Sequence, residues 1–160
     1  MKEQEAKPEL YTHKSPILPD IVFALSRIAK PAVLTTLVIG MYLHFTRLFI
    51  GTELLIKYIY TATFDAVFAI PMLLGVICFL PAWKHIVFRN KFEKVFVIVT
   101  GVYFLVSVPL HLQTWYTQST NYILVFPRWF SLLFLTYSSL LFIVWWRLKL
   151  KNMIGDSPVV

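Results

Sequence analysis

The fold class follows from residues 62–83, which read ATFDAVFAIPMLLGVICFLPAW. Asp65 is the only charged side chain among them. An α-helix rises about 1.5 Å per residue and the hydrocarbon core of a bilayer is about 30 Å thick, so a helix over this stretch is long enough to cross a membrane. A strand is excluded, because open sheets leave backbone groups unpaired in lipid and the alternating pattern of a barrel strand is absent. Residues 62–83 therefore predict a transmembrane helix.

Three further segments have the same character, and charged or aromatic residues bound each of them. Their predicted spans are residues 31–50, 95–112 and 129–146. Lys30 and Pro31 mark the start of the first span, since proline is tolerated in a first helical turn, and residues 21–26 before it predict a short interfacial helix. Pro71 and Pro109 lie inside spans and are expected to kink their helices without ending them, because neighbouring helices satisfy the freed carbonyl groups.

The composition of the whole chain agrees with these spans. Of its 160 residues, 58% are hydrophobic and 14% are charged, and the mean hydropathy is +0.70. A soluble domain draws about a quarter of its residues from Asp, Glu, Lys and Arg, so the composition disfavours a soluble enzyme, a DNA-binding protein and a disordered chain. Cys78 is the only cysteine, which excludes intrachain disulfides and thiolate zinc sites. We predict an all-α polytopic membrane protein with four transmembrane helices in a compact bundle.

Lysine and arginine are distributed unevenly along the chain, and their distribution predicts its orientation. Five lie in residues 1–30, four in the loop between the second and third spans, and three after residue 146, which is twelve of the fifteen. The positive-inside rule places these segments in the cytoplasm. We therefore predict a cytoplasmic tail with the interfacial helix (1–30), a transmembrane domain (31–146) and a cytoplasmic C-terminal tail (147–160). The net charge of +7 then reflects orientation and the lipid bilayer as partner, and no nucleic-acid partner is expected.

Five ionisable or imidazole side chains interrupt the spans at a similar depth. Counted from the cytoplasmic end of each helix, His44, Arg47, Asp65, His111 and Arg128 lie roughly 21–29 Å up. A charge at the centre of a bilayer costs about 2.5–3.5 kcal/mol on insertion scales, and the cost falls toward the interface. The two arginines could therefore extend outward to the headgroups as anchors, or the five side chains could face one another in a polar pocket.

Helical spacing favours the pocket. Each span carries a stripe of small and polar residues at intervals of three or four, which places the members of a stripe on one helix face. The four stripes are Gly40, His44, Arg47 and Gly51; Asp65, Phe68, Met72 and Gly75; Thr100, Phe104, Ser107 and His111; and Arg128, Ser131, Leu135 and Ser138. Asp65 is then expected to be the counter-ion of Arg47 or Arg128, because an unpaired carboxylate in an apolar setting would protonate.

Such a pocket predicts recognition of a small lipophilic molecule, such as a sterol, a quinone or a lipid. Aromatic and apolar walls with a few converging polar groups are the general form of a ligand site. The expected walls are Tyr42, Phe45, Phe68, Met72, Tyr103 and Phe104. The expected polar contacts are His44, Arg47, Ser107 and Arg128. If the pocket supports acid–base chemistry, Asp65 and His111 are the candidate catalytic residues, and whether the protein is an enzyme stays open.

Two short segments resemble a known family of membrane proteins. Asp65-Ala-Val-Phe-Ala-Ile-Pro71 places an acidic residue six positions before an intramembrane proline, and Val106-Ser-Val-Pro-Leu-His111 matches in placement on the third helix. Both are similar to the EXPERA family, the group of the sigma-2 receptor and the emopamil-binding sterol isomerase. The resemblance covers about residues 60–146 and implies a helical bundle in which paired acids, here Asp65 and Glu53, receive a protonated amine or carbocation-like centre. The isomerase's histidine and glutamate pair has no counterpart, so sterol isomerisation is not implied.

Two other functions remain open. His44 and His111 lie at similar depth on different helices, as bis-imidazole ligation of haem b requires, and Arg47 or Arg128 could meet the propionates. No other cofactor or metal is expected. Alternatively, the chain could be a non-catalytic accessory subunit or assembly factor of a larger membrane complex, because small four-span chains with little mass outside the membrane often act through a membrane-protein partner.

Overall fold

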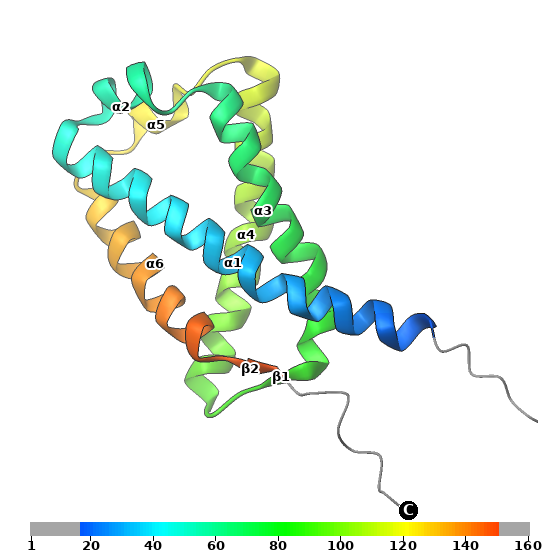
Figure 1. Ribbon diagram of the computed structural model, residues 1–160. Coiled ribbons are helices and arrows are strands. Elements are labelled where there is room, and N and C mark those ends of the chain that lie inside the picture. The colour runs from blue at the N-terminus through cyan, green and yellow to red at the C-terminus, as the bar shows by residue number, and fades with distance from the viewer. Residues whose placement is uncertain (1–16, 151–160) are drawn as a thin grey trace, which may run out of the picture.

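The structure is a computed structural model that describes residues 17–150, and helices make up nearly all of this part of the chain (Figure 1). Its elements are α1 (Ile17–Ile50), α2 (Thr52–Tyr58), α3 (Ala62–Ala82), the 3-10 helix η1 (Trp83–His85), β1 (Ile86–Val87), α4 (Lys91–Thr117), α5 (Tyr122–Val125), α6 (Phe130–Arg147) and β2 (Lys149–Leu150). Four helices, α1, α3, α4 and α6, are long and apolar enough to cross a membrane. The prediction of an all-α, four-span integral membrane protein is confirmed.

The N-terminal part of the fold differs from the prediction in one respect. Residues 21–26 do not form a separate interfacial helix, because α1 continues without a break through Pro31. Ala29 and Val33, on either side of the proline, are buried against the bundle, and this packing supports the helix where the proline removes one hydrogen bond. α3 and α4 likewise continue through Pro71 and Pro109, as expected. The predicted tails in residues 1–16 and 151–160 lie outside the described residues.

Local sequence explains where several helices begin and end. The Thr61 hydroxyl accepts a hydrogen bond from the backbone N–H of Phe64 (3.1 Å), and this caps the start of α3. Asn90 caps α4 in the same way through the N–H of Glu93 (2.9 Å). α1 and α2 are separated by Gly51, whose φ of 92° is open to glycine and strained for other residues. The chain can therefore turn sharply at this point and fold α2 over the end of the bundle.

The four long helices surround a common core, but they are not packed equally against one another. α1 crosses the bundle between α6 on one side and α3 on the other, and α3 packs along α4 (Figure 1). α4 and α6 make far fewer contacts than these pairs. A hydrogen bond from Nε1 of Trp145 on α6 to Oγ1 of Thr100 on α4 (3.0 Å) joins the two helices in the half of the bundle next to the strands. The contact between α4 and α6, which we call the α4–α6 seam, is therefore the loosest contact between neighbouring spans.

At each end of α6, a cation binds backbone carbonyl groups and joins this helix to α1. Nζ of Lys30 donates to the carbonyl oxygen of Leu148 (2.8 Å), just past the end of α6. At the opposite end, Nη2 of Arg128 donates to the carbonyl oxygen of Phe49 (2.8 Å), in the last turn of α1. The last carbonyl groups of a helix have no partner within the helix and favour a nearby cation. These two contacts hold α1 and α6 together along their whole shared length.

The two short strands show which ends of the chain lie together. β1 pairs antiparallel with β2, with Ile86 opposite Leu150. The loop between α3 and α4 and the residues after α6 therefore share one end of the bundle, which we call the β end, and Lys30 lies there as well. α2 and α5 cover the other end, the α2/α5 end (Figure 1). This arrangement agrees with the predicted grouping of basic segments, while the side of the membrane that each end faces stays a prediction.

Candidate functional site

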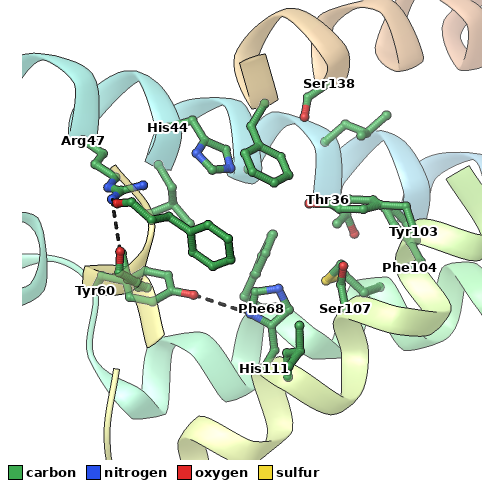
Figure 2. Close-up of a pocket in the computed structure, with 18 of the residues that line it drawn as sticks. Thr36, His44, Arg47, Tyr60, Phe68, Tyr103, Phe104, Ser107, His111 and Ser138 are labelled. Atoms are coloured by element: carbon green, nitrogen blue, oxygen red, sulfur yellow. Dashed lines mark hydrogen bonds between the residues drawn. The ribbon is translucent and has the colours of Figure 1, made fainter. Parts of the chain in front are cut away.

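A cavity of about 350 Å³ lies inside the α2/α5 end of the bundle. Side chains of α1, α3, α4 and α6 form its walls, and Leu55 of α2 and Ile123 of α5 help to close it. The walls are mostly apolar, and the volume falls within the range of about 300–1,000 Å³ that is usual for small-molecule sites. The close-up in Figure 2 shows Arg47, His44 and Tyr60 at one end of this cavity and Thr36 and Ser138 toward the other.

The polar stripes of the four spans face inward, as helical spacing predicted. Asp65, Thr100 and Ser131 are fully buried, and Ser138 and Arg47 are at most 5% exposed. Because these residues come from all four spans, the polar groups have been turned toward one another and away from lipid. The alternative in which the two arginines extend outward as interfacial anchors therefore fails for Arg47, whereas Arg128 is exposed.

Asp65 is the centre of a buried hydrogen-bond network. The Tyr60 hydroxyl donates to Oδ1 of Asp65, Nδ1–H of His111 donates to the same oxygen, and the Thr114 hydroxyl donates to Oδ2 (2.6 Å). Asp65 is 0% exposed, whereas the side chain of His111 is 13% exposed and lines the cavity. The structure thus brings together the two predicted catalytic residues, with the carboxylate behind the imidazole.

This arrangement fixes the orientation of the His111 ring. With Nδ1 held by Asp65, Nε2 is the ring nitrogen left for a molecule in the cavity. The carboxylate holds the ring in place, and through Nε2 the imidazole can exchange a proton with a bound molecule. Asp65 reaches the cavity only through His111 and is a positioning residue in this geometry.

His44 lies on the opposite wall, on α1. Its ring stacks on Phe134 of α6 with the two rings 4.8 Å apart and nearly parallel, at 2°. Nδ1 of His44 lies 3.4 Å from the Ser131 hydroxyl. The neighbouring protein groups therefore engage one face and one nitrogen of the ring, and Nε2 remains for a ligand.

Arg47 is buried, and its hydrogen bonds go to neutral oxygens. Nε donates to the Thr52 hydroxyl (2.8 Å), Nη1 to the Ser131 hydroxyl (3.4 Å), and Nη2 to the carbonyl oxygens of Ile123 (3.0 Å) and Phe126. These bonds join the end of α1 to the loop between α4 and α6. The prediction that Asp65 is the counter-ion of Arg47 or Arg128 is wrong, because Asp65 pairs with His111 and both arginines bind oxygens of the loops and helix ends.

Four residues predicted to belong to the site lie elsewhere. Arg128 and Glu53 are exposed, and Arg128 binds the end of α1 while Glu53 lies on the outer surface of α2. Tyr42 and Phe45 are 56% and 52% exposed. They lie on α1 two residues before and one residue after His44, which turns them at least 100° away from the stripe. By contrast, Phe68, Met72, Tyr103 and Ser107 line the cavity, as expected.

Sequence reasoning missed two members of the Asp65 network. Thr114 follows Ser107 and His111 at the spacing of the α4 stripe, so extending that stripe by one step would have found it. Tyr60 lies between α2 and α3, where no helical period applies, and its role depends on how the chain turns into α3. Periodicity can therefore identify groups within a span and not those that approach it from a turn.

The fold and the cavity define an integral, multi-pass helical membrane protein with a polar-ended cavity. Comparison of the chain with protein-family models, curated proteins and solved structures found no match in any of the three. The resemblance to the EXPERA family stays a prediction. Within residues 17–150, no three His, Cys, Asp or Glu side chains gather closely enough to hold a metal ion.

Proposed function

We propose that the protein binds a small lipophilic molecule in the cavity at the α2/α5 end. The observation that carries the proposal is the cavity itself, with mostly apolar walls from all four spans and with Arg47, His44 and Tyr60 at one end. Apolar walls accommodate a hydrocarbon or ring system, and a few convergent polar groups fix its orientation. Sterols, quinones and lipids with a polar head share this form.

The position of the cavity also supports a ligand that comes from the membrane. Val106 and Leu110 of α4 line the cavity and are 60% and 49% exposed. The cavity therefore reaches the outer surface of α4, close to the α4–α6 seam. That surface faces hydrocarbon when the helices span a bilayer, so a lipophilic molecule has a direct path.

Filling the cavity tests the proposal. Gly40 lines the cavity, and a Cβ added there would meet Cζ of Phe68 at 3.9 Å, an ordinary van der Waals contact. We expect Gly40→Leu to reduce the amount of co-purified ligand severalfold without unfolding the protein. The measurement is mass spectrometry of lipids extracted from the purified protein. Val38→Leu, at a position 49% exposed on the same helix, is the matched control and should retain the ligand. Equal lipid content in both variants, or no enriched lipid in the wild type, would contradict the proposal.

Haem b is the second candidate, and one structural feature favours it. His44 and His111 both line the cavity, and each has Nδ1 engaged by a protein group, as ligating histidines usually do. An absorption spectrum of the same preparation decides the question: a Soret band that disappears in His44→Ala or His111→Ala would establish haem.

A role as an accessory subunit or assembly factor predicts instead that a larger membrane complex co-purifies with the protein in stoichiometric amounts.

A further inference from the structure

The cavity has a cationic side chain in its wall and no acidic one. Arg47 lines it together with the imidazoles of His44 and His111, and no Asp or Glu does. Asp65 is the nearest acid in the site, and it is fully buried behind His111, to which it is hydrogen-bonded. The ion pair that Asp65 makes in this site is with His111 and not with Arg47. The positive charge of Arg47 is therefore not balanced by any carboxylate in the described part of the chain.

Arg47 itself is unusual for a cation inside a span. It is 5% exposed, and its four hydrogen bonds go to two hydroxyl and two carbonyl oxygens. A guanidinium carries five N–H donors, so one donor on Nη1 remains beyond the bond to Ser131. A buried charge is costly unless it meets an opposite charge, and neutral oxygens compensate it only in part. The missing partner is an anion.

We infer that the cavity binds a single-chain amphiphile with an anionic oxygen head, either a carboxylate or a phosphate monoester. The inference rests on the proposed function and names the ligand class. The head lies against Arg47, within reach of His44, because a guanidinium binds carboxylate and phosphate oxygens through two N–H groups at once. The chain extends toward Leu37, Met72 and Phe104, which form the apolar part of the wall.

The contrast between the two arginines near this end of the bundle supports the assignment. Arg128 also binds carbonyl groups, but it is exposed and outside the cavity, so water and headgroups can solvate it. Arg47 has the same kind of protein partners without that access. A purely structural clamp such as Arg128 does not need to face a cavity. The pair therefore offers a matched test in which one variant removes a charge from the cavity and the other removes a charge outside it.

The test compares four ligands of equal chain length on the purified protein in a nonionic detergent: lauric acid, dodecyl phosphate, dodecanol and dodecylamine. Displacement of a fluorescent fatty-acid analogue reports the affinity of each. We expect lauric acid or dodecyl phosphate to bind roughly 10- to 100-fold more tightly than dodecanol, with dodecylamine the weakest, because a hydrogen bond to a charged partner has about that worth. The stronger of the two anions identifies the head as carboxylate or phosphate.

Variants then assign the preference to one side chain. Arg47→Gln should bring the affinity for the preferred anion down to that for dodecanol, Arg47→Lys should keep part of the preference, and Arg128→Gln should keep all of it. Equal binding of acid, alcohol and amine by the wild type would overturn the inference while leaving the proposed function in place. Failure of every ligand to bind would instead contradict the proposed function. If Arg47→Gln does not fold, the wild-type series alone still decides between these outcomes.

Discussion

Replacing Asp65 with alanine is expected to lower the free energy of unfolding by about 3–5 kcal/mol, the usual cost of removing one partner from a buried ion pair. In this variant the Tyr60 hydroxyl and Nδ1–H of His111 lose the carboxylate as acceptor, and the Thr114 hydroxyl keeps only the carbonyl oxygen of His111 (2.7 Å). A single neutral hydrogen bond between membrane helices contributes only about 0.6 kcal/mol on average. The larger figure applies here because the acceptor is charged, fully buried and shared by three groups.

Thermal unfolding in detergent micelles measures this effect, and the midpoint should fall by roughly 6–20 °C for a chain of this size. Glu53→Ala is the matched control, since Glu53 is an exposed acid on α2 and its loss should change stability by less than about 0.5 kcal/mol. The double variant Asp65→Ala/His111→Ala should be destabilised by less than the sum of the two single effects. Each single variant already removes the Asp65–His111 interaction, so the sum counts the free energy of this interaction twice. Similar midpoints for Asp65→Ala and Glu53→Ala would show that the network does not stabilise the bundle.

The second large effect is expected at Gly75, where three helices meet. A Cβ placed on Gly75 would lie 3.2 Å from Cγ2 of Val33 on α1 and 3.3 Å from Cδ2 of Phe104 on α4. Val33 and Phe104 are themselves 2% and 1% exposed, so neither can move aside freely. Gly75→Val adds two methyl groups beyond that Cβ and should destabilise the protein by about 1–3 kcal/mol through overpacking. The same unfolding midpoint is the measurement.

Gly40→Val provides the comparison for this prediction. Both glycines lie inside spans, so the intrinsic helix preference of valine over glycine is the same at the two positions. A Cβ at Gly40 would have only an ordinary van der Waals contact with Phe68 (3.9 Å), and we expect the effect of Gly40→Val on stability to be neutral or slightly favourable. Equal loss of stability in the two variants would mean that the close contacts with Val33 and Phe104 do not limit the size of the residue at position 75.

Most of the fold could be predicted because lipid imposes strong rules on sequence. α3 and α6 begin and end within one residue of the predicted spans 62–83 and 129–146. α4 extends beyond its predicted span at both ends, since its caps at Asn90 and Gln118 lie in polar sequence that hydropathy does not mark. The sequence also failed to predict that α1 continues through Pro31, because the first span was predicted to begin at this proline. Proline marks a helix boundary in water, whereas packing on both sides of Pro31 allows the helix to continue.

The site could be predicted less completely. Helical spacing identified which side chains share a face, and it correctly turned His44, Arg47, Asp65 and His111 inward. Depth along a helix did not identify their partners. Whether Asp65 meets an arginine or a histidine depends on the rotation and crossing of α3 and α4, and those angles follow from the packing of the whole core. For the same reason, the exposed position of Arg128 could not be read from its place in a stripe.

The contacts of Lys30 and Arg128 at the two ends of α6 have a consequence for how the proposed ligand would reach the cavity. They hold α6 to α1, whereas α4 and α6 make few contacts and their hydrogen bond at Trp145 lies in the half of the bundle near the strands, so the proposed ligand would enter between α4 and α6. Entry is then sideways, out of the surrounding hydrocarbon. Occupancy would follow the mole fraction of the ligand among the membrane lipids, and its solubility in water would matter little.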